Sequence, residues 1–192
     1  MKIILASTSP RRHELLKTIT TDFEIASPKF DEGTVKQKSA KKLVEKLSFG
    51  KAQAVFEKAK GDWCVIGSDT VVCLKSGEVL GKPKDQKDAK SMLKKISGTT
   101  HYVLTGVCVL YRNEDIEHKI SFVEKSKVTF KKLTDLEIET YILTNEPMDK
   151  AGAYAMQGLA GKFVKSINGS YSNIVGLPTE QLYEILLQEG II

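Results

Sequence analysis

The chain has 192 residues, of which 41% are hydrophobic and 28% are charged, and its formal net charge is +5. This composition is typical of a globular protein, and the length predicts a single domain over residues 1–192. No apolar stretch reaches the roughly 18 residues that predict a membrane span, and no signal peptide is recognisable. The three cysteines, Cys64, Cys73 and Cys108, form no CxxC pair. We therefore expect reduced core thiols and a cytoplasmic location.

Much of the positive charge comes from lysines between residues 36 and 60. Lysines strung along a helix are usually a solvated face, whereas a nucleic-acid groove more typically mixes arginines and aromatic residues into its patch. Neither stable nucleic-acid binding nor membrane association is expected. A small anionic substrate is equally compatible with the charge.

The N-terminal stretch predicts a buried strand at Lys2–Ala6 and a helix at Pro10–Thr18 that is capped by Ser9. Arg11 and Arg12 then fall in the first helical turn, where the helix dipole disfavours cations. An anion bound at this helix start would remove the conflict, because free N–H groups at a helix start bind phosphates well. The alternative is that both arginines reach out into solvent.

An extended piece at 23–25 and an irregular segment at 27–37 precede a helix predicted over Ser39–Lys60. Lys51 projects from the middle of the apolar stripe of this helix. An inward lysine must reach water or meet a negative group, since burying it alone is costly; the alternative is snorkelling at the helix end. The stripe consists of Ala40, Val44, Leu47 and Val55.

Residues Trp63–Leu74 predict a strand that turns and returns to Leu80. Asp69 interrupts the apolar run of this strand. A carboxylate there needs a partner or a metal, or must become neutral by raising its pKa. We favour a functional role, while a structural aspartate bonded to backbone amides is the alternative.

The rest of the chain predicts a mixture of helices and strands. Residues 148–161 are rich in Gly and Ala, which suits either close approach of a ligand or an ordinary surface loop. The remaining elements are a helix between Asp85 and Gly98, strands at His101–Arg112 and Lys119–Lys131, a helix opened by the Thr134–Glu137 capping box, a hairpin of Phe163–Ile167 with Tyr171–Val175 around Asn168-Gly169, and a final helix after Leu177-Pro178.

Several enzyme classes are excluded by their missing motifs. Gly77–Pro83 resembles a P-loop but is one residue short and lacks its Ser/Thr, and GxGxxG, GxSxG and HExxH are absent. What remains is an inventory of cations for phosphates and of carboxylates for a metal or an attacking water, which is what hydrolysis of a phosphoanhydride requires. Its members are Ser7, Arg11, Arg12, Glu32, Lys51, Asp69, Lys82, Asp149 and Lys150.

Taken together, the motifs resemble the Maf family of nucleotide pyrophosphatases and look closest to its dTTP/UTP-hydrolysing branch. They are Ile4–Leu16, Gly67–Thr70, Leu80–Pro83, Ser97-Gly98, Glu146–Gly158 and Gly169–Pro178. The resemblance implies an α/β fold with a mixed, curved sheet flanked by helices, and two lobes around a deep cleft, as in inosine triphosphatases. It also implies hydrolysis between the α and β phosphates, giving the monophosphate and pyrophosphate.

Site roles follow from the same resemblance. It implies that Asp69 is the proton acceptor, that Glu32 and Lys82 are catalytic, and that base choice depends on an arginine of Pro10–Arg12, Thr70 and Gln157. It further implies substrate binding by Ser7, Arg11, Arg12 and Lys51, and a Mg²⁺ or Mn²⁺ ion held by Glu32 and Asp69. Mild departures from the family pattern are Ser68, Ala155-Met156 and Ser172.

Two other interpretations stay open from the sequence. One is a pyrophosphatase for non-standard or modified purine triphosphates. The other is a nucleotide-sensing regulator of cell division that binds nucleic acid or a division partner. The leading interpretation is a house-cleaning nucleoside triphosphate pyrophosphatase whose partner is its substrate; a homodimer is compatible with the resemblance, although no sequence feature requires one.

Overall fold

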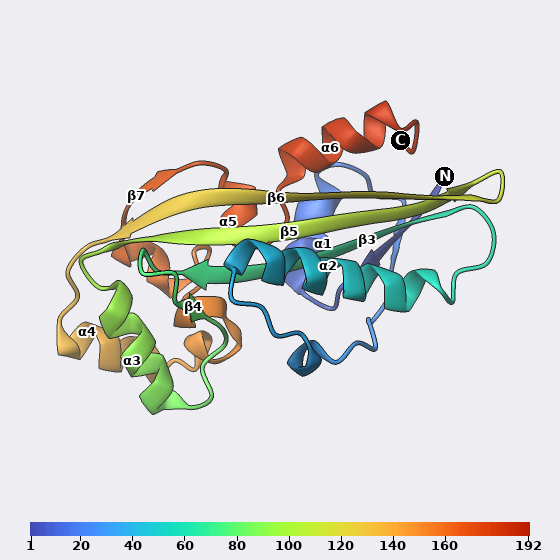
Figure 1. The fold of residues 1–192 in the computed structure, drawn as a ribbon. Coiled ribbons are helices and arrows are strands. Elements are labelled where there is room, and N and C mark those ends of the chain that lie inside the picture. The colour runs from blue at the N-terminus through green and yellow to red at the C-terminus, as the bar shows by residue number, and fades with distance from the viewer. The chain divides into compact units, whose positions relative to one another are not determined.

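The computed structural model describes all 192 residues, which form two compact units. The first unit contains residues 1–69, 105–124 and 176–192, and the second contains residues 70–104 and 125–175. The strands belong to one seven-stranded sheet in the order β2-β1-β3-β5-β6-β7, with β4 paired to β3 (Figure 1). No helix is long and apolar enough to cross a membrane.

The N-terminal strands of the first unit are parallel. β1 pairs with β2 and with β3, and Ala6 at the end of β1 lies opposite Gly67. This register brings the loop that begins at Ser7 close to the part of β3 that carries Asp69. The helices and strands are β1 (Lys2–Ala6), α1 (Pro10–Lys17), β2 (Phe23–Ile25), the 3-10 turn η1 (Glu32–Thr34), α2 (Ala40–Phe56), β3 (Trp63–Cys73), β5 (Thr100–Asn113), β6 (Ile116–Phe130) and α6 (Thr179–Gln188), of which β3, β5 and β6 continue into the second unit.

The second unit contains antiparallel pairs, β3 with β4 and β6 with β7, so the sheet is mixed as predicted. Its helices α3 and α4 lie side by side (Figure 1). Its own elements are β4 (Val79–Leu80), α3 (Gln86–Ile96), α4 (Asp135–Ile142), the 3-10 turns η2 (Glu146–Asp149), η3 (Ala151–Ala153) and η4 (Leu159–Phe163), β7 (Val164–Asn168) and α5 (Tyr171–Val175).

Local signals explain most of these elements. The Asp85 side chain accepts a hydrogen bond from Asp88 N and caps α3, and both halves of the capping box that opens α4 are formed. The turn between β5 and β6 has positive φ at Glu114 and Asp115, the geometry of a tight hairpin. Each unit has its own apolar core, and all three cysteines are buried and free, as expected.

One predicted element is wrong. Tyr171–Val175 is the helix α5 and not a strand. β7 pairs instead with β6, an antiparallel neighbour that lies far away in the sequence. The Asn-Gly signal was overridden because β7 finds a partner in β6, and because the Ser170 hydroxyl accepts a hydrogen bond from Asn173 N at 3.2 Å and so caps a helix instead.

Candidate active site

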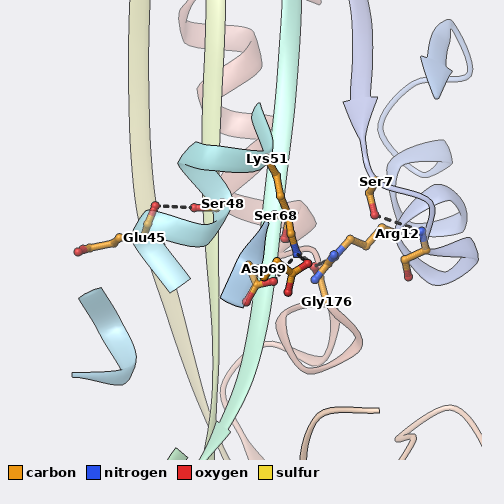
Figure 2. Close-up of polar contacts among 10 residues, drawn as sticks. Ser7, Arg12, Glu45, Ser48, Lys51, Ser68, Asp69 and Gly176 are labelled. Carbon is orange, nitrogen blue, oxygen red and sulfur yellow. Dashed lines mark hydrogen bonds and ion pairs between the residues drawn. The ribbon is translucent and has the colours of Figure 1, made fainter. Parts of the chain in front are cut away.

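Lys51 is a buried cation in the middle of α2, with only 8% of its surface exposed. Its Nζ donates to Asp69 Oδ1 at 2.5 Å and lies 2.9 Å from Glu32 Oε1. The prediction that this inward lysine meets a negative group is therefore confirmed. Figure 2 shows the side chains of Lys51 and Arg12 converging on Asp69 from α2 and α1.

Two glycines allow α2 to lie close enough to the sheet for this contact. A Cβ atom at Gly67 would lie 2.3 Å from the carbonyl oxygen of Ser48, and one at Gly106 would lie 2.4 Å from that of Val44. Any side chain at either position would push the helix backbone away from the strands. Gly67 stood within a recognised motif, whereas sequence reasoning missed Gly106 because an isolated glycine in a strand carries no specific signal.

Asp69 and Glu32 differ in their exposure. The side chain of Asp69 is 10% exposed, like that of Lys51, whereas the side chain of Glu32 is 53% exposed. Glu32 opens the turn η1, whose shape is fixed where Asp31 accepts a hydrogen bond from Gly33 N at 3.0 Å. The buried Lys51 thus forms ion pairs with one enclosed carboxylate, that of Asp69, and one solvent-facing carboxylate, that of Glu32.

The loop between β1 and α1 is held by its own polar groups. Ser7 is buried, and its hydroxyl accepts a hydrogen bond from Ser9 N at 3.2 Å. The carbonyl of Ser7 accepts another from His13 Nε2 at 2.7 Å. As predicted, Ser9 occupies the cap position and Pro10 the first turn of α1, although the Ser9 side chain makes no capping hydrogen bond. His13 was not among the predicted site residues.

Arg12 turns back from α1 toward the same carboxylates. Its Nε donates to the carbonyl oxygen of Gly176 at 2.8 Å. Burial lowers the pKa of Arg12, and Arg11 lowers it further, while the negative charges of Asp69 and Glu32 raise it. Arg12 therefore lies in the electrostatic field of both carboxylates, and Arg11 is half-buried beside it.

The carbonyl of Gly176 joins the C-terminal segment to this cluster. It also accepts a hydrogen bond from Ser68 Oγ at 2.9 Å, so two donors share it. Gly176 has a φ of +129°, a conformation that favours glycine. The sequence placed Gly176 in a motif without assigning it a role, and only the structure connects it to Arg12.

The other predicted residues belong to the second unit. Thr70 follows Asp69 on β3 and is half-buried, while Lys82 and Gln157 are exposed. Asp149 and Lys150, which were counted in the sequence inventory, form an ion pair with each other. The structure thus brings together Ser7, Arg12, Glu32, Lys51 and Asp69 in the first unit, and places Thr70, Lys82 and Gln157 in the second.

The carboxylate pair fits a hard divalent cation. Mg²⁺ is commonly bound through one or two carboxylates, with water and substrate phosphate oxygens completing its shell. Glu32 and Asp69 both approach Lys51 Nζ, so their oxygens face a common centre of positive charge. No group of three or more His, Cys, Asp or Glu side chains is arranged to hold a metal ion.

The fold places the chain in a known structural class. The Staphylococcus aureus Ham1 protein matches it with a TM-score of 0.56 at 14% identity, over 98% of this chain and all of that one. A HAM1 protein from Coxiella burnetii matches with a TM-score of 0.53 at 12% identity, over 98% of this chain and 99% of that one. The architecture is therefore the α/β fold of Ham1 proteins.

Sequence relatives define the family within that class. The family model described as Maf-like protein matches residues 2–189, and the chain belongs to the Maf family. A dTTP/UTP pyrophosphatase from Clostridium novyi (strain NT) is 49% identical over all of this chain and 99% of its own length. One from Thermosipho africanus (strain TCF52B) is 47% identical over all of this chain and 95% of its own length.

Proposed function

We propose that this protein hydrolyses dTTP and UTP to the nucleoside monophosphate and pyrophosphate. The observation that carries the proposal is the buried Lys51, held between Asp69 and Glu32 beside Arg12. Relatives at 49% and 47% identity that are named dTTP/UTP pyrophosphatase support this choice of substrates. The match of the family model to residues 2–189 supports treating residues 1–192 as a single catalytic domain.

Asp69 is the proposed proton acceptor. The oxygen of a water molecule forms a bond to phosphorus at the α–β anhydride, the phosphorus–oxygen bond to the pyrophosphate breaks, and the water's proton passes to Asp69. Lys51 Nζ donates a hydrogen bond to Asp69 Oδ1 at 2.5 Å, which orients the carboxylate that is proposed to accept the proton.

The cations bind and neutralise the triphosphate. Ser7, Arg11, Arg12 and Lys51 are the proposed phosphate-binding residues, and Lys82 is proposed to stabilise charge on the leaving pyrophosphate. The guanidinium of Arg12 is oriented by its hydrogen bond to Gly176, which supports a role for Arg12 in positioning phosphate oxygens.

A divalent metal, Mg²⁺ or Mn²⁺, completes the proposed site. Arg12 and Lys51 carry two positive charges and Glu32 and Asp69 two negative ones, so the formal charges of these four side chains sum to zero. A polyanionic substrate therefore needs further positive charge. Glu32 and Asp69 would hold the ion, which when bound would neutralise charge on the phosphoryl group that is transferred.

Base choice is assigned to Thr70, Gln157 and an arginine of the first helical turn. A glutamine amide can accept a hydrogen bond from N3–H and donate one to the O4 carbonyl, the pattern that thymine and uracil present. Gln157 is exposed, as a residue that contacts a base must be. The buried, unpaired cysteines support a reducing, cytoplasmic setting for this activity.

A panel of triphosphates tests the proposal. The protein is incubated with dTTP, UTP, dCTP, dGTP and modified purine triphosphates, with Mg²⁺ or Mn²⁺ and with chelator, and the products are separated. We expect monophosphate and pyrophosphate from dTTP and UTP only when metal is present. Release of diphosphate and orthophosphate would contradict the cleavage position. Preferred turnover of modified purines would favour the alternative substrate class.

A further inference from the structure

Gln157 lies in a hydrogen-bonded turn of the second unit. The N–H of Gly158 donates to the carbonyl of Ala155 at 3.1 Å, which makes Met156 and Gln157 the central residues of a β-turn. The segment around this turn is otherwise short 3-10 helix and irregular chain. Contacts from outside the turn are therefore needed to fix the conformation of this segment.

The first end of the turn is held by Tyr141 on α4. The Tyr141 hydroxyl accepts a hydrogen bond from Ala155 N at 3.2 Å and donates its own proton to Glu146 Oε1 at 2.8 Å. Tyr141 is only 2% exposed. Burial and the bond to Glu146 raise the pKa of Tyr141, so its hydroxyl remains a donor at neutral pH.

The second end of the turn is held by Glu146. Its Oε2 accepts a hydrogen bond from Leu159 N at 3.1 Å. A Cβ atom at Gly158 would lie 2.4 Å from each carboxylate oxygen, so the chain can pass here only as glycine while Glu146 keeps its position. One carboxylate and one hydroxyl, which we call the Tyr141–Glu146 clamp, thus fix both ends of the turn.

We propose that Tyr141 and Glu146 are positioning residues that set the base specificity of the enzyme by holding the turn that carries Gln157. This rests on the proposed function, in which Gln157 reads the pyrimidine. The glutamine amide, turned over, would suit cytosine equally well. Discrimination between thymine and cytosine therefore requires a fixed placement of Gln157, and a displacement of about 0.5 Å is enough to lose it.

The role of the Tyr141 hydroxyl can be tested separately from the packing of the Tyr141 ring. The Tyr141 ring packs edge-on against Phe163, with centroids 5.4 Å apart, and a phenylalanine would keep this contact. Tyr141→Phe therefore removes the hydrogen bonds alone. Glu146→Gln keeps one carbonyl oxygen as acceptor, and Gly158→Ala displaces the carboxylate while leaving Tyr141 in place. Tyr183→Phe changes an exposed tyrosine on α6 and serves as control.

The test measures kcat and KM for dTTP and dCTP, together with amide hydrogen exchange at Ala155 and Leu159. For Tyr141→Phe and Gly158→Ala we expect the preference for dTTP over dCTP to fall by about tenfold, through a higher KM for dTTP with kcat nearly unchanged. Both amides should exchange faster. Glu146→Gln should lie between these variants and the wild type, and Tyr183→Phe should match the wild type.

Each contrary outcome points to a different error. Unchanged exchange at both amides in Tyr141→Phe would overturn the clamp itself, and this measurement needs no substrate. Faster exchange with full discrimination would overturn the role in specificity, as would a loss confined to kcat on both substrates. A wild type that turns over dTTP and dCTP equally would instead contradict the proposed function, and this inference with it.

Discussion

The ion cluster of the first unit and the Tyr141–Glu146 clamp of the second unit hold functional side chains in opposite ways. The cluster uses buried charges, where the cost of desolvation opposes the attraction between Lys51 and Asp69. The clamp uses hydrogen bonds in which one carboxylate accepts from neutral donors, a type that contributes about 1.5–3 kcal/mol each. Removing one partner of the charge cluster should therefore cause a large loss of stability, whereas removing one hydrogen bond of the clamp should cause a smaller loss.

The largest expected effect comes from breaking the buried pair. Lys51→Met removes the cation that donates directly to the enclosed Asp69, and we expect the free energy of unfolding in urea to fall by about 3–5 kcal/mol, with loss of activity. The double variant Lys51→Met/Asp69→Asn should regain much of this stability and remain inactive. Lys46→Met on the exposed side of α2 is the matched control. Equal stability of Lys51→Met and Lys46→Met would show that the pair is not effectively buried.

Removing the charge of Asp69 alone separates chemistry from stability. Asp69→Asn keeps the shape of the side chain but cannot accept the proton of water, so kcat should fall by about 10² or more. The rate of monophosphate formation measures this, with circular dichroism to confirm folding. The exposed Asp62→Asn is the control. Near-full activity of Asp69→Asn would remove Asp69 from its proposed role.

The close approach of α2 to the sheet is tested by Gly67→Ala. The added methyl group would meet the backbone of Ser48 and Ala52, and we expect a loss of about 1–3 kcal/mol in unfolding free energy. Gly81→Ala, where nothing lies within 4 Å of the new atom, is the stability control. If both variants are equally stable, α2 has room to move, and the contact between Lys51 and Asp69 does not depend on glycine at this position.

The second unit should show a graded pH dependence through His101. This residue is fully buried beside Phe130 and Tyr154, and burial lowers its pKa from 6.5 to about 4. The unfolded chain then binds the extra proton between those values. Stability that is fully present above pH 6.5 is therefore lost as the pH falls toward 4, by up to about 1.4 kcal/mol per pH unit.

The measurement for His101 is urea unfolding at a series of pH values. His101→Gln can still form a hydrogen bond with the Tyr154 hydroxyl, which lies 2.9 Å from His101 Nε2, but glutamine does not titrate. Its unfolding free energy should therefore fall less steeply between pH 6.5 and 4 than that of the wild type. Parallel pH profiles would mean that His101 titrates alike in the folded and unfolded chain.

Local sequence signals predicted the elements that depend on local physics. Asp85 and Thr134 cap α3 and α4 as predicted, and Pro10 begins α1, because capping and turn chemistry act within a few residues. The hairpin predicted around Asn168-Gly169 failed because strand pairing is decided by which distant strand is available, and β6 was available to β7.

The sequence by itself determined that Lys51 lies in the apolar stripe of a helix and that Asp69 interrupts the apolar run of a strand. A charged residue among apolar ones can be recognised without a structure. Only the tertiary structure decided that these two residues are partners, because their contact depends on parallel strand register and on the approach of α2 over Gly67 and Gly106. The role of the Gly176 carbonyl could likewise not be predicted, because every residue has a backbone carbonyl and the sequence does not show which one accepts a side-chain hydrogen bond.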